Sequence, residues 1–132
     1  MPRLSEFEAI LRRNEPLAPY TLLRLGGPAE MLLQPRSLEE LSGVVKRCFD
    51  ENIPLRVLGS GCNMLIRDEG VPGAVVRLSE PAFTQIRVEG QTVPGCTGAS
   101  VSALISAAAR EGLAGLETLV GMPGTIGGAI RT

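Results

Sequence analysis

The sequence predicts a mixed α/β or α+β fold, and three observations support this prediction. The chain has 132 residues, of which 44% are hydrophobic and 20% charged, so it fits one domain with a core of its own. Residues 29–58 show strand, helix and strand patterns in succession, which is typical of a βαβ unit. A glycine-rich turn follows the second strand directly, and another apolar run follows the turn. Together these features indicate a sheet with flanking helices.

Three segments carry the signals of a helix start. Ser5 and Ser37 are each followed by glutamate three residues later, which is the Ser-x-x-Glu capping box. Ser100 precedes a segment with apolar residues at helical spacing, and Gly112 is suited to end that segment. The three predicted helices begin at Ser5, Ser37 and Ser100, and they end near Asn14, Asn52 and Gly112.

Strands are predicted where short apolar or alternating runs lie between turn-forming residues. Such runs occupy Ala29 to Leu33, Leu55 to Leu58, Met64 to Arg67 and Ala74 to Leu78. A hairpin is also predicted over Phe83 to Val93, because the turn-forming residues Glu89-Gly90-Gln91 interrupt it. The sequence shows neither an internal repeat nor an interdomain linker.

Charge and residue content argue against several classes of function. The net charge of −1 does not predict a nucleic-acid or membrane partner, and the chain has no histidine to serve as general base or metal ligand. Cys48, Cys62 and Cys96 have neither CxxC nor metal-ligand spacing, so no metal is expected. The N-terminus lacks the apolar core of a signal peptide, and no apolar run approaches the ~20 residues of a membrane helix. We therefore expect a cytoplasmic protein.

A Gly-x-Gly loop after Leu58 is the most informative motif. Its glycines allow several backbone N–H groups to converge on one point, as they do in an anion-binding nest. The loop lacks both the third glycine of a dinucleotide-binding fingerprint and the Gly-Lys-Ser/Thr of a Walker A motif. It is therefore either a phosphate cradle or a tight turn without a ligand. The loop comprises Gly59, Ser60, Gly61, Cys62 and Asn63.

A second glycine segment lies near the end of the chain. Five of the eight residues from Gly121 to Gly128 are glycine or proline, which disfavours a helix or a strand. Such a backbone can lie flat against a planar ligand or a pyrophosphate, and Thr125 adds a hydroxyl donor. A flexible loop is the alternative, although Met122 and Ile126 are unusual in one. Because a segment of this kind needs further residues to hold its shape, we expect the natural chain to continue beyond Thr132.

Three other residues each allow two interpretations. Arg24 either pairs with a phosphate or lies solvated at a turn before the first strand. Glu117 either anchors the second glycine segment or is a surface carboxylate. Cys62 is either a reactive thiol in the cradle or a small packing residue, and we favour packing.

Three segments have an order and spacing that point to one family. They are Thr21 to Ala29 with Gly-Gly-Pro-Ala, Leu58 to Asp68 with Gly-Ser-Gly-Cys-Asn, and Gly115 to Ala129 with Gly-Leu-Glu and Met-Pro-Gly-Thr-Ile-Gly-Gly-Ala. Together they resemble UDP-N-acetylenolpyruvoylglucosamine reductase, a flavoenzyme family of bacterial peptidoglycan precursor synthesis. The similarity runs from about Pro19 to the last residue.

The resemblance implies an α+β fold, the two-lobed FAD-binding domain of the vanillyl-alcohol-oxidase (PCMH) type. On this basis residues 1–18 form an N-terminal helix and lead-in, and residues 19–132 form the FAD-binding domain. Residues 19–80 would be a small βαβ lobe and residues 81–132 part of a second, mixed-sheet lobe. The domain would be incomplete at its C-terminal end, and the substrate-binding domain would be absent.

The resemblance also assigns contacts to FAD. It places the pyrophosphate at the first glycine loop and the flavin along the second glycine segment. It also brings the residues just before the third predicted helix close to the cofactor. The implied FAD-binding residues are Gly59, Ser60, Gly61, Cys62, Asn63, Met64, Gly98, Ala99, Gly121, Met122, Pro123, Gly124, Thr125, Gly127 and Gly128. The family usually has serine where Cys62 stands, which removes one hydrogen bond of about 0.5–1.5 kcal/mol. Isoleucine is commoner than Met122.

The implied reaction passes a hydride from NADPH to FAD and then to the enolpyruvyl group of a UDP-sugar, which gives UDP-N-acetylmuramate. The family's catalytic arginine, serine and glutamate map onto nothing in this chain, so no catalytic residue is assigned. We therefore expect the isolated chain to bind FAD weakly, as a monomer, without reductase activity. Two alternatives remain, namely the FAD-binding fragment of a related oxidase and a non-catalytic nucleotide-binding module.

Overall fold

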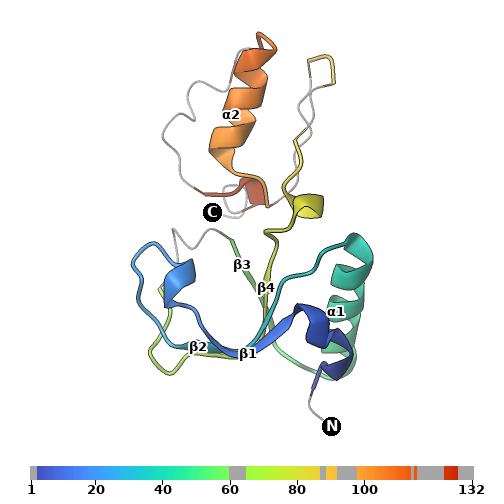
Figure 1. Ribbon diagram of the computed structural model, residues 1–132, viewed down its shortest axis with the longest axis vertical. Helices are drawn as coiled ribbons and strands as arrows, with labels where there is room; N and C mark the ends of the chain where they lie inside the picture. The colour runs from blue at the N-terminus through green and yellow to red at the C-terminus, as the bar shows by residue number, and fades with distance from the viewer. Residues whose placement is uncertain are drawn as a thin grey trace. The chain divides into compact units, whose positions relative to one another are not determined.

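The computed structural model describes residues 3–59, 65–86, 89–91, 98–113, 115 and 124–127. The chain divides into two compact units, Met1–Leu78 and Ser79–Thr132. The first unit carries the sheet, and the second carries a helix and the segments beside it (Figure 1). Each unit is described by itself.

A four-stranded mixed sheet forms the centre of the first unit. Its strand order is β1-β2-β4-β3, with β1 antiparallel to β2 and the other neighbours parallel. Helix α1 connects β2 to β3, so β2, α1 and β3 form the predicted βαβ unit, with β4 inserted between the two strands. The elements are β1 (Leu11–Pro16), β2 (Pro28–Leu33), α1 (Leu38–Asp50), β3 (Leu55–Leu58) and β4 (Val71–Arg77).

The core of this unit lies on both faces of the sheet. Side chains of a strand alternate between the faces, so neighbours in sequence enter different clusters. Met31 of β2 and Val76 of β4 pack with Val44 of α1, whereas Leu32 and Val75 pack on the other face. That second cluster also contains Leu17, Ala29, Leu58 and Ile66.

Cys48 is a packing residue of the α1-facing cluster. It is buried and carries a free thiol. Burial is the main cause that raises the pKa of the Cys48 thiol, and the neighbouring charge of Glu51 adds to it. The thiol is therefore protonated near neutral pH, which suits a structural role.

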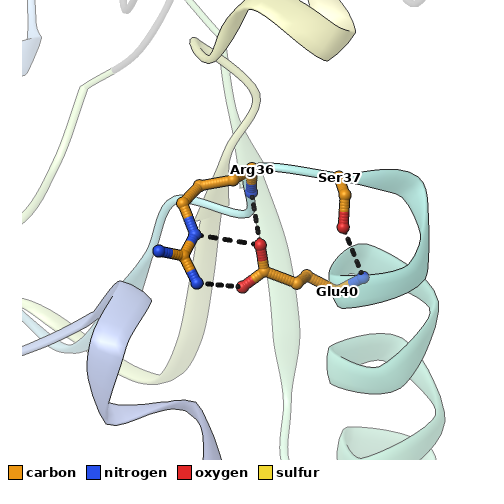
Figure 2. Close-up of polar contacts among 3 residues, drawn as sticks. All are labelled: Arg36, Ser37 and Glu40. Atoms are coloured by element: carbon orange, nitrogen blue, oxygen red, sulfur yellow. Dashed lines mark hydrogen bonds and ion pairs between the residues drawn. The ribbon is translucent and has the colours of Figure 1, made fainter.

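Helix α1 begins where the sequence predicts, and Figure 2 shows the contacts that start it. The Ser37 hydroxyl oxygen accepts a hydrogen bond from the Glu40 backbone N–H at 3.2 Å. The Glu40 carboxylate binds the Arg36 guanidinium through two hydrogen bonds of 3.0 and 3.1 Å. It also accepts from the Arg36 backbone N–H at 3.3 Å, one residue earlier than the usual capping box. The start of α1 is thus fixed by local contacts.

Replacement of Ser37 by alanine should therefore destabilise the first unit. The Glu40 N–H would lose its acceptor, and the loss of an N-cap side chain costs about 1 kcal/mol. Urea unfolding followed by far-UV circular dichroism measures this change. Ser42→Ala, at an exposed position inside the same helix, is the control and should not destabilise the chain. Equal stability of the Ser37 variant and the parent would rule out the cap as a stabilising contact.

The N-terminal helix was predicted correctly at its start but not in its type or its end. A 3-10 helix spans Ser5–Ile10 without a side-chain cap, and Leu4 precedes it at φ +59°. The chain then becomes strand β1, which pairs with β2 from Leu11↔Leu33 to Pro16↔Pro28. Ile10 and Leu11 are buried in the α1-facing cluster. Long-range pairing with β2 therefore overrides the local capping signal at Ser5.

The strand predicted over Met64 to Arg67 is also wrong where the structure describes it. Residues 65–67 have no regular structure, and Leu65 is 79% exposed. Met64 lies outside the described residues. The Arg67 carbonyl accepts hydrogen bonds from the backbone N–H groups of Gly27 (2.9 Å) and Gly70 (3.0 Å). The apolar run therefore enters a tight turn, and β4 begins only at Val71.

Glu30 joins the N-terminus and β4 to strand β2. Its carboxylate accepts a hydrogen bond from the Gly73 backbone N–H at 2.7 Å and pairs with the Arg3 guanidinium. The hydrogen bond from Gly73 is the main cause that lowers the pKa of Glu30, and the bond from Arg3 is the second. Because the folded pKa is lowered, this stabilisation is present above the unfolded pKa of about 4.3 and is lost as the pH falls through the folded pKa.

The chain should lose stability as the pH falls below about 4.3, and Glu30 should account for part of this dependence of stability on pH. Glu30→Gln cannot ionise, so its stability should depend less on pH in this range. Urea unfolding midpoints at a series of pH values measure the slope, and Glu111→Gln, an exposed carboxylate of the second unit, is the control. An unchanged slope in Glu30→Gln would show that this carboxylate does not contribute.

The second unit is built around α2 (Val101–Arg110). The Ser100 hydroxyl caps it by accepting from the Ala103 N–H at 3.0 Å, and Gly112 follows its C-cap at φ +70°, so both predicted ends are confirmed. Of the predicted hairpin, the turn at Gly90 is present, while residues 87–88 and 92–93 lie outside the described part. Within the described residues, neither helix has the length and apolar character needed to cross a bilayer.

Candidate functional site

The first part of the site is the edge of the sheet where β2, β4 and β3 end. These strands are parallel, so their carboxyl ends meet at the same edge. Leu58 ends β3, Arg77 ends β4, and the two residues pair directly across the strands. Gly59, the first residue of the predicted phosphate loop, follows Leu58 at this edge. In open α/β sheets, ligands bind outside the carboxyl ends of the strands.

Only part of the predicted first glycine loop can be placed. Gly59 is described, whereas Ser60, Gly61, Cys62, Asn63 and Met64 lie outside the described residues. In the second glycine segment, the described residues are Gly124 to Gly127, and Gly121, Met122, Pro123 and Gly128 lie outside. Glu117 and the carboxyl-terminal residues 129–132 lie outside as well. Their assignments stay predictions.

Two chain segments interlock where the chain returns from the first glycine loop. A Cβ atom on Gly27 would meet the Asp68 carbonyl oxygen, and one on Gly70 would meet the Pro28 carbonyl oxygen. Gly70 also has a φ of +89°, which side chains rarely adopt. Glycine is therefore required on both sides, and the interlock fixes the chain that leads out of the loop. From the sequence, Gly26-Gly27-Pro28 indicated only a turn.

Arg24 lies in an exposed turn of the same unit. Its backbone N–H donates to the Thr21 carbonyl at 3.3 Å, and its φ is +56°. Its neighbours Leu22, Leu23 and Leu25 are each at least 59% exposed. The turn interpretation of this segment is confirmed, and a contact of Arg24 with a phosphate stays a prediction.

A cluster of Tyr20, Glu15 and Arg77 links strand β1 to the end of β4, and it was not found from the sequence. The Arg77 guanidinium carbon is 5.1 Å from the centre of the Tyr20 ring. The Tyr20 hydroxyl donates to a Glu15 carboxylate oxygen at 3.1 Å. Burial raises the pKa of Tyr20, and the contact with Glu15 adds to the rise, so the hydroxyl is protonated and can donate. No local signal marked this cluster, because Arg77 comes near Gly59 only through the pairing of β3 with β4.

In the second unit, the structure brings two predicted site segments together at the start of α2. The Val101 N–H donates to the Gly124 carbonyl at 3.0 Å, and the Ile126 N–H donates to the Ala99 carbonyl at 2.8 Å. Ser100 and Thr125 form an antiparallel bridge between these bonds. Gly124 has a φ of +102°, and Ala99 is 2% exposed. Gly98 adds a hydrogen bond of 2.8 Å to the Phe83 carbonyl.

The site offers binding and orienting groups. The described residues contain no cluster of acidic or cysteine side chains able to hold a metal ion. In the first unit, the Arg77 guanidinium is a group of the kind that binds phosphate oxygens. In the second unit, Gly124 has a positive φ, which favours glycine. The arrangement can hold and orient a phosphate-bearing cofactor.

Comparison with known proteins identifies that cofactor. Residues 29–132 match the FAD binding domain family. The chain is 46% identical to the UDP-N-acetylenolpyruvoylglucosamine reductase of Bradyrhizobium sp. over 121 residues, which cover 92% of this chain and 39% of the relative. It is 47% identical to the same enzyme of Paramagnetospirillum magneticum, with coverage of 89% and 38%. The chain thus spans about two fifths of the length of these relatives.

Solved structures give the same result. The crystal structure of UDP-N-acetylenolpyruvylglucosamine reductase from Thermus caldophilus aligns with a TM-score of 0.72 and 38% identity, covering 91% of this chain and 40% of that one. A solvent-stable cholesterol oxidase aligns with a TM-score of 0.61 over 82% of this chain, but its 19% identity shows a shared fold alone. The predicted resemblance, fold class and FAD cofactor are therefore confirmed.

Proposed function

This chain belongs to the FAD binding domain family, and on that premise we propose that it is the FAD-binding part of an NADPH-dependent UDP-N-acetylenolpyruvoylglucosamine reductase. The parent enzyme would convert UDP-N-acetylenolpyruvoylglucosamine to UDP-N-acetylmuramate for peptidoglycan. It would therefore act in cell-wall synthesis, and so in cell shape and division, and we propose that it does so in the cytoplasm. We propose that the chain itself is a monomer without a nucleic-acid or membrane partner.

The observation that carries the proposal is the bridge at the start of α2. It brings Ala99 together with Gly124 and Thr125, three residues that the resemblance assigns to FAD. These residues are separated in sequence by all of α2, so their meeting is a property of the fold. The backbone at Gly124 has a conformation that favours glycine, so the bridge carries no side chain at this position.

The residues of the chain would bind and orient the cofactor. FAD, when bound, supplies the hydride-transfer chemistry. The first glycine loop, from Gly59 to Asn63, would hold the pyrophosphate, because backbone N–H groups at a strand end can converge on phosphate oxygens. The second segment, from Gly121 to Gly128, would lie along the flavin. The proton donor and the UDP-sugar site would belong to the part of the parent enzyme outside this chain.

Two measurements on the purified chain test this proposal. Titration with FAD, followed by flavin fluorescence, should show saturable binding at one FAD per chain. An assay with NADPH, FAD and the enolpyruvyl UDP-sugar should show no turnover. Failure to bind FAD would overturn the proposed binding function. Turnover by the chain alone would overturn the proposal that the proton donor and the UDP-sugar site belong to the rest of the parent enzyme.

A further inference from the structure

Arg77 differs from other arginines of the first unit in its partners. Five of them form ion pairs with glutamates, and they are Arg3, Arg12, Arg13, Arg36 and Arg47. Among the described residues, no carboxylate forms an ion pair with Arg77, and its buried Nε has no hydrogen-bond partner. Buried guanidinium N–H groups are usually paired, because an unpaired one has given up its hydration without replacement. An acceptor is therefore missing at Arg77.

The position of Arg77 indicates what that acceptor is. Arg77 is the last residue of β4 and pairs with Leu58, and Gly59 follows Leu58. Paired residues on neighbouring strands direct their side chains to the same face of a sheet. Arg77 thus lies at the carboxyl edge, beside the point where β3 enters the first glycine loop. A ligand at this edge would meet a positive charge.

Tyr20 and Glu15 hold this charge in place. The guanidinium packs over the Tyr20 ring at 5.1 Å, and the ring is anchored by its hydroxyl bond to Glu15 at 3.1 Å. Arginine suits such a position, because its planar guanidinium stacks on an aromatic ring while its N–H groups remain able to bind phosphate oxygens. Lysine would keep the charge and lose the stacking.

We propose that Arg77 binds the diphosphate of the cofactor at the carboxyl edge, with Tyr20 as its positioning residue. This inference rests on the proposed FAD-binding function and adds a specific cation to it. A second interpretation, in which Arg77 only packs against Tyr20 and stabilises the fold, predicts a different response to salt and to conservative substitution.

Binding of FAD and of ADP to variants at Arg77 tests the proposal, since both ligands carry a diphosphate. Arg77→Gln should weaken both ligands about tenfold or more and reduce the salt dependence of binding. Arg77→Lys should recover part of the affinity and the salt dependence. Tyr20→Leu should weaken binding because the guanidinium loses its platform, whereas Tyr20→Phe keeps the ring and should bind nearly as the parent does.

Arg56→Gln is the matched control. Arg56 is an exposed arginine on the neighbouring strand β3, where it pairs with Val75 and precedes the strand end at Leu58. Its loss should therefore change FAD binding by less than about twofold. Circular dichroism confirms folding of each variant. Parent-like FAD affinity in Arg77→Gln, or equal losses in the Gln and Lys variants with unchanged salt dependence, would overturn the role of Arg77. Absence of FAD binding in the parent chain would instead overturn the proposed function.

Discussion

Gly70→Ala should destabilise the first unit more than alanine at any other described glycine of this unit. The new Cβ would collide with the Pro28 carbonyl oxygen, and the residue would have to keep a φ of +89°. A strained backbone of this kind costs about 1–3 kcal/mol, and the collision adds to it because both partners are backbone atoms. Against a typical total stability of about 5–15 kcal/mol, a large loss in urea midpoint is expected.

Two further substitutions separate the causes. Gly27→Ala should also destabilise, through collision with the Asp68 carbonyl oxygen, without a positive φ. Gly90→Ala, at φ +62° with no atom within 4 Å of the new Cβ, adds backbone strain without a collision. We expect the loss to be greatest for Gly70 and smallest for Gly90. A Gly27 variant as stable as the parent would contradict the interlock.

Ile126→Pro should weaken FAD binding about tenfold or more. Proline has no N–H, so the buried Ala99 carbonyl would lose the hydrogen bond of 2.8 Å that joins the two site segments. An unsatisfied buried acceptor costs about 1–3 kcal/mol, and 1.4 kcal/mol corresponds to a factor of ten. Ile126 begins a helical turn, where the fixed φ of proline is tolerated. The substitution therefore tests the hydrogen bond rather than the shape of the turn.

FAD titration measures this effect, and amide hydrogen exchange reports on the bridge itself. The Val101 amide, bonded to Gly124 across the same bridge, should exchange faster in the proline variant. Ile126→Val keeps the N–H and should bind FAD like the parent. If the proline variant loosened the Val101 amide but bound FAD with unchanged affinity, the bridge would not be part of the FAD site.

The sequence was a good guide where structure depends on residues close together in the chain. Ser37 and Ser100 start α1 and α2 as predicted, because an N-cap needs only a hydroxyl and an N–H three residues later. The end of α2 before Gly112 is equally local. Strands β2 and β3 were also predicted, since their apolar runs lie between clear turn residues.

Structure that depends on distant partners was not predictable in this way. The capping signal at Ser5 was overridden because residues 11–16 pair with β2, and no local pattern shows that edge to be available. The interlock of Gly27 with Asp68 joins two segments whose contact depends on the whole sheet. Arg77 reaches the edge beside Gly59 only through the register of β3 and β4. The cofactor could be named because the family resemblance adds spacing information that no single motif contains.

The most direct test of FAD binding by this chain is a titration of the isotopically labelled protein with FAD. The backbone amide NMR signals of both glycine segments are followed as FAD is added. The account predicts that Gly59 and Arg77 in the first unit, and Ala99 and Ile126 in the second, all shift with the same dissociation constant and saturate at one FAD per chain. Shifts confined to other residues, or no saturable shift of these four amides, would contradict FAD binding by the two glycine segments.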